Sequence, residues 1–194
     1  MKYILNALLV AIILFLIYML VNSIKEPIAF REEKVKREIV VIDRLKEIRK
    51  AQEIYRDITG EFAGSWDTLV YVLMNDSIPF EYIVGDPDDP ENLDKIIRTV
   101  TYSSAYDSIK SLGINLERLR FVPFAPEGTI FDITADTLTY QQTMVHVVEV
   151  GTRYNAFMGD YADAKFSKYD SRYSPNNRLK FGDLSKPNLT GNWE

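Results

Sequence analysis

The sequence contains no cysteine and a single histidine among its 194 residues, and each shortage excludes a class of chemistry. Without cysteine the chain forms no disulfide, has no thiolate nucleophile and cannot bind zinc through sulfur. One histidine is too few for a metal site built from a histidine pair or cluster. The formal net charge of −5 disfavours general nucleic-acid binding, in which Lys and Arg neutralise phosphates. We therefore expect neither a nucleic-acid partner nor a bound cofactor.

Sequence motifs of catalysis are also missing. The chain has no G-x-S-x-G nucleophile elbow and no glycine-rich phosphate loop among its nine glycines. His146 lies in an apolar run predicted as a strand, where alternation places it on one face with Val148 and Val150. A lone histidine in a strand is typical of a packed or surface residue rather than of a general base. We therefore expect a protein that is not an enzyme.

One acidic segment, GDPDDPE at residues 85–91, is the candidate metal site. Calcium takes about six to eight oxygen ligands, which closely spaced carboxylates can supply. The spacing matches no EF-hand, and the two prolines indicate an exposed, rigid turn. We expect a solvated loop, with a calcium site as the alternative; its carboxylates would come from Asp86, Asp88, Asp89 and Glu91.

The N-terminal residues are almost free of charge. Residues 3–21 read YILNALLVAIILFLIYMLV, and only Asn6 among them is clearly polar. A helix needs about 20 such residues to cross the roughly 30 Å hydrocarbon core of a bilayer. We therefore predict a transmembrane anchor over residues 1–24, in which Asn6 hydrogen bonds to another helix or reaches the interface. A signal peptide cleaved near the sequence VNS is the alternative.

The charges around the span give conflicting signals about its orientation. Counted literally, the positive-inside rule places the large domain in the cytoplasm, because more basic residues follow the span than precede it. A signal-like segment at the N-terminus, however, usually exports the domain behind it. We expect the N-terminus inside and the domain outside. The residue before the span is Lys2, and those after it are Lys25, Arg31, Lys34, Lys36 and Arg37.

Residues 25–60 are predicted to form a membrane-proximal amphipathic helix. Pro27 marks a kink or interruption, and a helical pattern follows from Phe30 to Thr59. Apolar residues recur there at steps of three and four, which indicates one stripe on a helix of 3.6 residues per turn. Gly60 is placed for a left-handed C-cap. We expect the stripe to pack on the domain's own sheet or on a neighbouring copy, and it comprises Val35, Ile39, Ile42, Leu45, Ile48 and Tyr55, with Ala51 and Ile58.

Residues 61–154 are predicted to form an α+β domain. A short helix begins after the N-cap Ser65 and ends near Asn75. Residues 108–112 indicate one helical turn, and Glu127-Gly128 suggests a hairpin. The order predicts an α+β fold in which the transmembrane helix continues into a long amphipathic helix packed on an antiparallel β-sheet. β-Branched and aromatic runs predict its strands, at residues 80–84, 96–103, 119–124, 129–134 and 145–151.

Residues 155–194 show no regular helix or strand period. The segment is polar and aromatic, and we expect an irregular chain that its rings pin to the domain. Stacking of these rings on a sugar or a peptide is the alternative. The rings are those of Phe157, Tyr161, Phe166, Tyr169, Tyr173, Phe181 and Trp193.

The stretch RLKEIRKAQEIYRDITGEFAGSWDTLVYVL, residues 44–73, resembles the exposed half of the N-terminal helix of type IV pilins and pseudopilins. In that family the pattern L-x-x-I-x-x-A-Q-x-x-Y is followed by a glycine, an aromatic residue and a short helix. Leu45, Ile48, Ala51, Gln52, Tyr55, Gly60, Phe62 and Leu69 match it. The resemblance implies a pilin-like fold. Prepilins also have a glycine before the cleavage point and a glutamate shortly after it, and the first 25 residues of this chain contain neither residue type.

The whole chain, including its ending LKFGDLSKPNLTGNWE, is also similar to uncharacterised single-pass envelope proteins of Bacteroidota. These resemblances imply a membrane-anchored, pilin-like envelope protein of a bacterial inner membrane, with its C-terminal domain in the periplasm. Such a protein acts as a structural or interaction subunit of a secretion, motility or filament assembly, through protein partners or copies of itself. The alternative is a periplasmic ligand-binding or sensing module anchored by one helix, with an unknown ligand.

Overall fold

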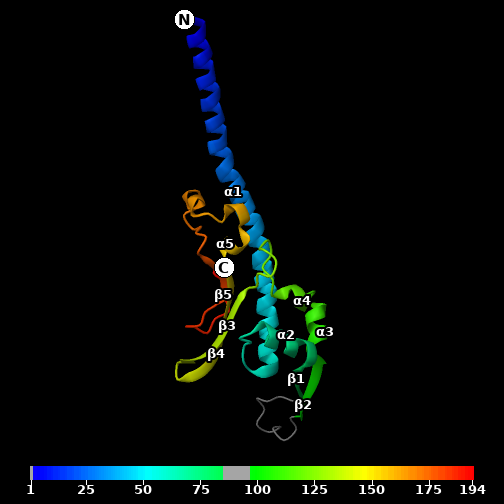
Figure 1. Cartoon of the computed structure of the whole chain (residues 1–194). Helices are drawn as coiled ribbons and strands as arrows, with labels where there is room; N and C mark the ends of the chain where they lie inside the picture. The colour runs from blue at the N-terminus through cyan, green and yellow to red at the C-terminus, as the bar shows by residue number, and fades with distance from the viewer. Residues whose placement is uncertain (1, 85–96) are drawn as a thin grey trace.

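The structure is a computed structural model that describes residues 2–84 and 97–194. It is an α+β protein in which one long helix, α1 (Lys2–Thr59), carries the folded domain on its C-terminal half (Figure 1). The N-terminal half of α1 projects away from that domain. The long N-terminal helix and the antiparallel strands expected from the sequence are thus confirmed.

α1 is one continuous helix, and the interruption expected at Pro27 does not occur. Proline removes one backbone N–H and therefore one i→i−4 hydrogen bond. In a helix of 58 residues this loss is confined to one turn, and the helix continues on both sides of it. α1 ends as predicted at Gly60, which has a φ of 84° and donates its N–H to the Arg56 carbonyl at 2.8 Å.

The N-terminal part of α1 is long and apolar enough to cross a membrane, and the rest of the described chain buries none of it. These properties are compatible with a single-pass anchor. A signal sequence meets the same criteria of length and composition.

Three short helices pack beside the C-terminal half of α1, and side chains cap all of them. α2 (Trp66–Asn75) begins as predicted after Ser65, whose Oγ accepts the Thr68 N–H at 3.2 Å. α3 (Ala105–Ser111) is longer than the single turn expected there. α4 (Leu116–Leu119) ends at the first residue of the run 119–124 that was predicted as a strand, and in that run only Phe121 forms an isolated bridge. That prediction is wrong because Asn115 caps two backbone N–H groups and starts a helical turn instead.

The strands form two small antiparallel sheets rather than the single sheet expected. β1 (Ser77–Val84) pairs with β2 (Ile97–Ser104) in a two-stranded ribbon. This ribbon lies at the end of the molecule farthest from the N-terminus (Figure 1). β3 (Asp132–Tyr140), β4 (Thr143–Arg153) and β5 (Arg178–Gly182) form the second sheet in the order β3-β4-β5.

The three-stranded sheet corrects two further expectations. Its hairpin turns at Gln141 and Gln142, which have positive φ values of 48° and 68°. The predicted hairpin at Glu127-Gly128 closes only an isolated bridge between Phe121 and Ile130. β5 lies inside the segment that was expected to be irregular, where α5 (Tyr154–Phe157), η2 (Gly159–Tyr161) and η3 (Ala164–Lys168) also form. Regular structure therefore reaches well into residues 155–194.

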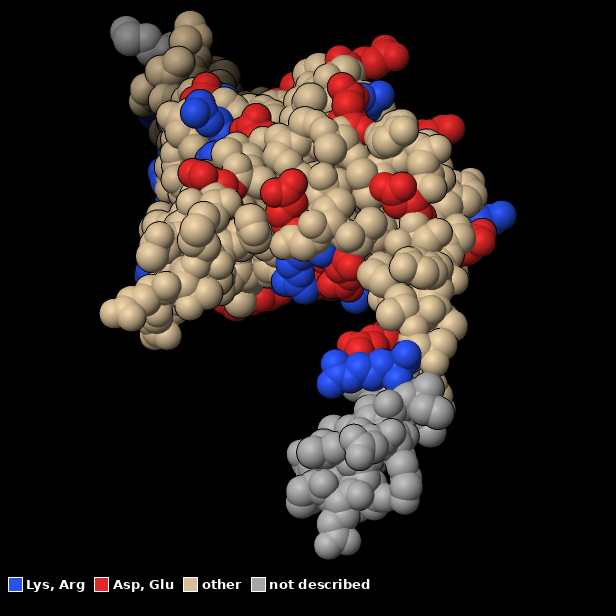
Figure 2. Space-filling view, turned by 90° about the horizontal axis from the view of Figure 1, so that it is seen from below, with Lys and Arg blue, Asp and Glu red and all other residues tan. Residues whose placement is uncertain are grey.

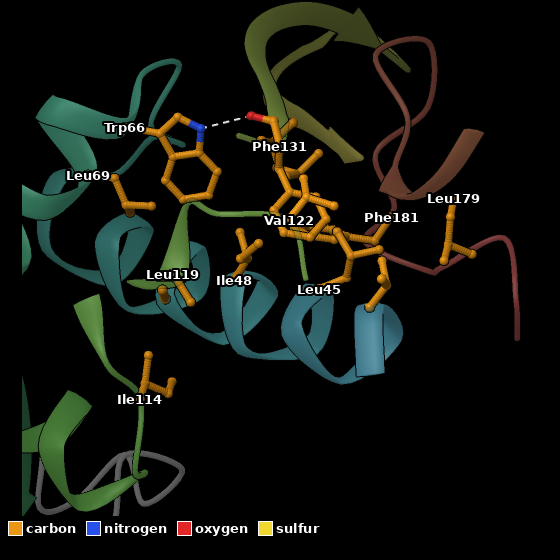
Figure 3. Close-up of a cluster of buried hydrophobic side chains, with 14 of the residues drawn as sticks. Leu45, Ile48, Trp66, Leu69, Ile114, Leu119, Val122, Phe131, Leu179 and Phe181 are labelled. Atoms are coloured by element: carbon orange, nitrogen blue, oxygen red, sulfur yellow. Dashed lines mark hydrogen bonds between the residues drawn. The ribbon is translucent and has the colours of Figure 1, made fainter. Parts of the chain in front are cut away.

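The core lies where α1 meets α2, α4 and the strands, and Figure 3 shows part of it. Trp66 donates its indole N–H to the Phe131 carbonyl at 2.9 Å, which joins the start of α2 to the chain leading into β3. Gln52 is the buried polar residue on this side of α1. Its side-chain amide donates to the Ala63 carbonyl and accepts from the Ala63 N–H, both at 3.0 Å. The loop after α1 is thereby fixed to the helix.

Candidate functional site

The apolar stripe predicted on α1 is divided between two faces of the helix. Leu45, Ile48 and Tyr55 are buried against the domain. Val35 and Ile39 are 53% and 54% exposed. Ile42, between the two groups, is partly buried. The predicted residues therefore form one packing face inside the domain and a second one that the domain leaves uncovered.

The spacing of these residues explains the division. With 3.6 residues per turn, a step of four advances the direction of a side chain by about 40° past a full turn, whereas a step of three falls about 60° short. The apolar residues after Ile42 follow mostly in steps of three, to Leu45, Ile48 and Ala51. The stripe therefore winds around α1, and Val35 does not share a direction with Ile48.

The uncovered face carries a regular row of apolar side chains, whose last member, Ile42, is partly buried by the domain. We call this set, spaced seven residues apart, the outer row; it comprises Leu14, Val21, Ile28, Val35 and Ile42. Seven residues are nearly two helical turns, so the row keeps to one side of α1. Phe30 and Val41 point the other way and are fully buried. The outer row thus extends from the apolar N-terminal part of α1 to the level of the domain, and Val21, Ile28 and Val35 are 40–53% exposed.

Asn6 lies on the same side of α1 as the outer row. It precedes Ile24 by 18 residues, which is five full helical turns, and Ile24 precedes Ile42 by the same number. Asn6 is exposed in the isolated chain. Its amide is therefore placed to hydrogen bond to another helix lying along this side.

A group of aromatic rings holds the C-terminal segment against α1 at its other face. We call residues 157–173 the collar. The ring of Phe30 stacks on Phe166 with a centroid distance of 5.3 Å and an interplanar angle of 5°. It meets Tyr173 and Tyr161 edge-on at 5.0 and 5.8 Å. The sequence predicts that these rings pin the C-terminal segment to the rest of the protein, and their packing on Phe30 does so.

Polar contacts tie the collar to α1 at several heights. Nearest the N-terminus, Tyr169 donates its hydroxyl to Glu26 at 2.6 Å, and Arg31 donates to the Tyr169 carbonyl at 3.1 Å. Eight residues after Glu26 on α1, Lys34 pairs with Asp170 at 2.9 Å. This hydrogen bond from Lys34 lowers the pKa of the Asp170 carboxyl. The collar is thus fixed to α1 by charge as well as by packing.

Tyr154 closes the same network from the start of α5. Its hydroxyl donates to Glu38 of α1, and Lys34 lies 3.5 Å from the same carboxylate. Burial raises the pKa of Tyr154, and the hydrogen bond to Glu38 raises it further. Tyr154 therefore stays protonated and acts as a donor at neutral pH.

A polar cleft of about 740 Å³ opens between α1 and the C-terminal strand. Its charged wall residues are mostly paired with acids, such as Arg178 with Glu149 at 3.0 Å and Lys180 with Glu149 at 2.5 Å. Two donors in the wall, Arg178 Nε and Trp193 Nε1, are buried and have no acceptor within the described residues. The cleft therefore offers polar groups to a small molecule but few uncompensated charges.

The other predicted site residues do not form a site in the described chain. Asp86, Asp88, Asp89 and Glu91 lie outside the described residues. Within residues 2–84 and 97–194, no group of three or more acidic or histidine side chains is arranged to hold a metal ion. His146 is exposed on β4 and forms a 3.1 Å hydrogen bond with Thr137 across the hairpin, as a surface residue does.

The two-stranded ribbon, at the end of the molecule farthest from the N-terminus, exposes uncharged aromatic side chains. Phe80, Tyr82 and Tyr102 of the ribbon are 52–72% exposed. The register places Phe80 and Tyr82 on one face of the ribbon and Tyr102 on the other. Figure 2 shows this end of the molecule, where acidic and basic side chains are scattered among uncharged ones without a patch of one sign. The view gives no support for an electrostatic docking surface there.

Sequence reasoning missed the residues that join the collar to α1. Lys34, Arg37 and Glu38 are residue types expected on a solvated helix face, yet all three are partly buried by the C-terminal segment. Arg37 donates to the Phe157 carbonyl at 2.6 Å. The residue that could have indicated these contacts was Phe30. It is a large aromatic residue about one helical turn before Lys34, in a part of α1 whose other residues are mostly exposed.

Neither a protein-family model nor a curated protein or a solved structure matches this chain.

Proposed function

We propose that the protein is a single-pass, membrane-anchored envelope subunit of pilin-like design, which assembles with copies of itself or with related subunits through α1. The single observation that carries the proposal is the outer row. In this row Val21, Ile28 and Val35 stay 40–53% exposed, whereas Phe30 on the opposite side of α1 and, further along, Val41 are fully buried by the domain.

Two features of α1 support assembly through this face. A seven-residue apolar repeat is the pattern by which helices pack side by side at a shallow crossing angle. Exposed valine and isoleucine on a helix outside the bilayer gain free energy when a partner removes them from water, about 25 cal/mol for each Å² of apolar surface. A partner helix running from the bilayer into the periplasm would cover the whole row at once.

The pilin-like part of the proposal rests on architecture and on the matching residues of α1. The resemblance implies a long N-terminal helix packed on one antiparallel sheet. The half-embedded α1 and the antiparallel pairing agree with it, although the strands form two small sheets instead of one. Gln52, one of the matching residues, holds the loop after α1 through both of its amide atoms. The absence of Gly and Glu from the first 25 residues favours an assembly that does not use prepilin processing.

The proposed location is a bacterial inner membrane with the domain in the periplasm. A signal-like segment at the N-terminus usually exports the domain behind it, and the proposal follows this signal rather than the larger number of basic residues after the span. In such a place the protein would serve as a structural or interaction component of a secretion, motility or filament assembly. The proposal assigns it no catalytic role.

Assembly through the outer row is tested with the full chain in mild detergent. Val35→Glu puts a charge at the centre of the row, while Val40→Glu puts the same charge at a 41% exposed valine on another side of α1. A charge buried without a partner costs several kcal/mol, so Val35→Glu should weaken association by roughly a hundredfold or more. Light scattering coupled to gel filtration reports the mass of the complex.

We expect a multi-subunit complex for the wild type and for Val40→Glu, and a monomer for Val35→Glu. A wild-type chain that remains monomeric at every accessible concentration would contradict the proposal. Equal dissociation by both substitutions would also contradict it, because the effect would then be general and not a property of the row.

A second candidate function is ligand binding in the polar cleft, as a periplasmic binding or sensing module. The observation that favours it is the pair of unsatisfied donors, Arg178 Nε and Trp193 Nε1, in its wall. Citrate at constant ionic strength should then raise the melting temperature of the full chain and change Trp193 fluorescence. An unchanged melting temperature, with the same result for phosphate, counts against an anion in this cleft.

A further inference from the structure

The collar is the part of the folded domain that lies nearest to the N-terminal half of α1 (Figure 1). The contact of the collar nearest the N-terminus of α1 is the hydrogen bond from Tyr169 to Glu26. The next contact along the helix is the hydrogen bond from Arg31 to the Tyr169 carbonyl. Because α1 continues without a break through Pro27, the level of the collar along the helix is fixed relative to the apolar N-terminal part.

The helix geometry places this contact next to a bilayer. Glu26 follows Val21, the end of the apolar run, by five residues, which is about 7.5 Å along the axis. The polar headgroup layer on each side of the hydrocarbon core is roughly 5–7 Å thick. Ile24 and Ile28, on either side of Glu26, are still 55% and 52% exposed. The edge of the collar nearest the N-terminus of α1 therefore lies at the outer boundary of the headgroup layer.

Two exposed lysines of the collar have the chemistry of an interfacial surface. Lys165 and Lys168 are exposed, and their ammonium groups lie over the rings of Phe166 and Tyr169 at 4.8 and 4.6 Å from the ring centroids. Lysine stems that lie along an apolar surface while the ammonium group stays in polar surroundings are typical of membrane interfaces, and so are tyrosine rings.

The collar contains three acidic and three basic residues, but the two kinds are engaged differently. Asp163 accepts the Lys165 N–H at 2.8 Å as the cap of η3, and Asp170 pairs with Lys34. In the part of the chain that the structure describes, neither Lys165 nor Lys168 lies within salt-bridge distance of a carboxylate. The side-chain hydrogen bond with Tyr169 raises the pKa of Lys168, and Glu26 raises it further, so Lys168 stays charged. Both ammonium groups are exposed and can contact an external anion, while Asp160 is the acid of the collar without a salt bridge or cap contact within the described residues.

We propose that the collar rests on the bilayer surface and that Lys165 and Lys168 bind the phosphate groups of anionic phospholipids. This inference rests on the membrane anchoring proposed above. The contact gives α1 a second point of attachment beside the span, so that the domain is held at one tilt and one rotation relative to the membrane. A defined rotation in turn keeps the outer row turned toward neighbouring subunits.

The experiment uses the full chain in nanodiscs of phosphatidylcholine alone and of phosphatidylcholine mixed with phosphatidylglycerol. Hydrogen–deuterium exchange of peptides covering residues 159–170 is compared between the two lipid compositions. A lysine near an anionic surface contributes about 1 kcal/mol, which corresponds to roughly fivefold slower exchange for each residue. We expect slower exchange of the collar in the mixed nanodiscs.

Paired variants locate the effect. Lys165→Glu with Lys168→Glu should remove the dependence on phosphatidylglycerol, whereas Lys46→Glu with Lys50→Glu, the same charge change on exposed residues farther along α1, should preserve it. Unchanged unfolding of each variant, followed by tryptophan fluorescence, shows that the collar is still folded.

The outcomes separate this inference from the anchoring on which it rests. A chain that does not enter nanodiscs contradicts the anchor itself, and with it the collar contact. A chain that enters them but exchanges equally in both compositions leaves the anchor standing and overturns the collar contact. Inorganic phosphate that reproduces the slowing in phosphatidylcholine alone would also overturn it, because the site would then bind free anions rather than the lipid surface.

Discussion

The two faces of α1 differ in what covers them, although both are apolar. On the inner face Phe30, Val41 and Ile48 are completely buried by the domain. On the outer face Val35 and Ile39 remain more than half exposed. The same residue type therefore serves the stability of the fold on one side of the helix and is free for association on the other. Substitutions placed around α1 can test whether this division holds.

The largest effect is expected from Phe30→Ala on the inner face. Phe30 contacts four rings of the collar and is the ring through which that segment packs on α1. Truncation of a buried phenylalanine costs about 3–5 kcal/mol. Urea unfolding of the full chain in detergent, followed by tryptophan fluorescence, measures the loss. A loss below about 1 kcal/mol would mean that the collar does not depend on the inner face.

A slightly smaller loss is expected from Gln52→Ala at the other end of the inner face. The substitution leaves the Ala63 N–H and carbonyl without their partner in a buried place. Each unsatisfied group costs about 1–3 kcal/mol, so the free energy of unfolding should fall by about 2–4 kcal/mol. Asp57→Ala, an exposed position on the same helix, serves as the control and should change it by less than about 0.5 kcal/mol. Equal effects of the two substitutions would show that the Gln52 contacts are not needed.

The helix that carries Phe30 and Gln52 also shows which features local sequence signals can predict. The long helix, its C-cap at Gly60 and the start of α2 at Ser65 were predicted because caps and helical periods involve residues close together in the chain. Gln52 was noticed only as part of a family pattern. Its partner Ala63 lies beyond the helix end, where no periodic signal reaches.

The errors arose where distant segments meet. β5 was missed because its partner, β4, lies about 30 residues earlier, and the run RLKFG alone is too short to show a strand period. The run 119–124 is rich in β-forming residues, but α4 occupies its first residue and turns follow at 120 and 123–124, so only the bridge at Phe121 forms. The collar contacts of α1 were missed because Lys34 and Glu38 are the residue types expected at a solvated surface. Sequence showed the apolar residues of α1 but not which of them the domain would cover.

A pH-dependent effect is expected at the border between the two faces, where Glu38 receives the hydroxyl of Tyr154. Burial raises the pKa of Tyr154 in the folded state, whereas in the unfolded chain it is about 10. Above that pH the unfolded chain loses the proton and the folded protein keeps it. The free energy of unfolding should therefore fall by about 1.4 kcal/mol per pH unit for this residue as the pH rises above 10.

The measurement is urea unfolding at a series of alkaline pH values. Tyr154→Phe should make the decline less steep by one proton, while Tyr71→Phe, at a 67% exposed tyrosine, should leave it unchanged. An identical decline in both variants would show that Tyr154 ionises as easily when folded as when unfolded. In that case Tyr154 would behave as a residue of the exposed face of α1 and not as one of the buried face.

The smallest effect on stability, and the sharpest test of the comparison, is expected from Val35→Ala. Val35 and Val41 are the same residue type less than two helical turns apart, but Val35 is 53% exposed and Val41 is fully buried. Val35→Ala should change the free energy of unfolding by less than about 0.5 kcal/mol, because little apolar surface at this position is removed from water on folding. Val41→Ala should lower it by about 2 kcal/mol, because it leaves a cavity under α1.

The two valine substitutions should exchange their order when association is measured instead of unfolding. Unfolding is measured at a concentration where the chain is dispersed in detergent, so that assembly does not add to the stability. Dilution of the assembled protein should then dissociate Val35→Ala earlier than Val41→Ala. If Val35→Ala dissociated at the same concentration as the wild type, the outer row would be an exposed surface without a role in assembly, since its truncation would affect neither the fold nor the complex.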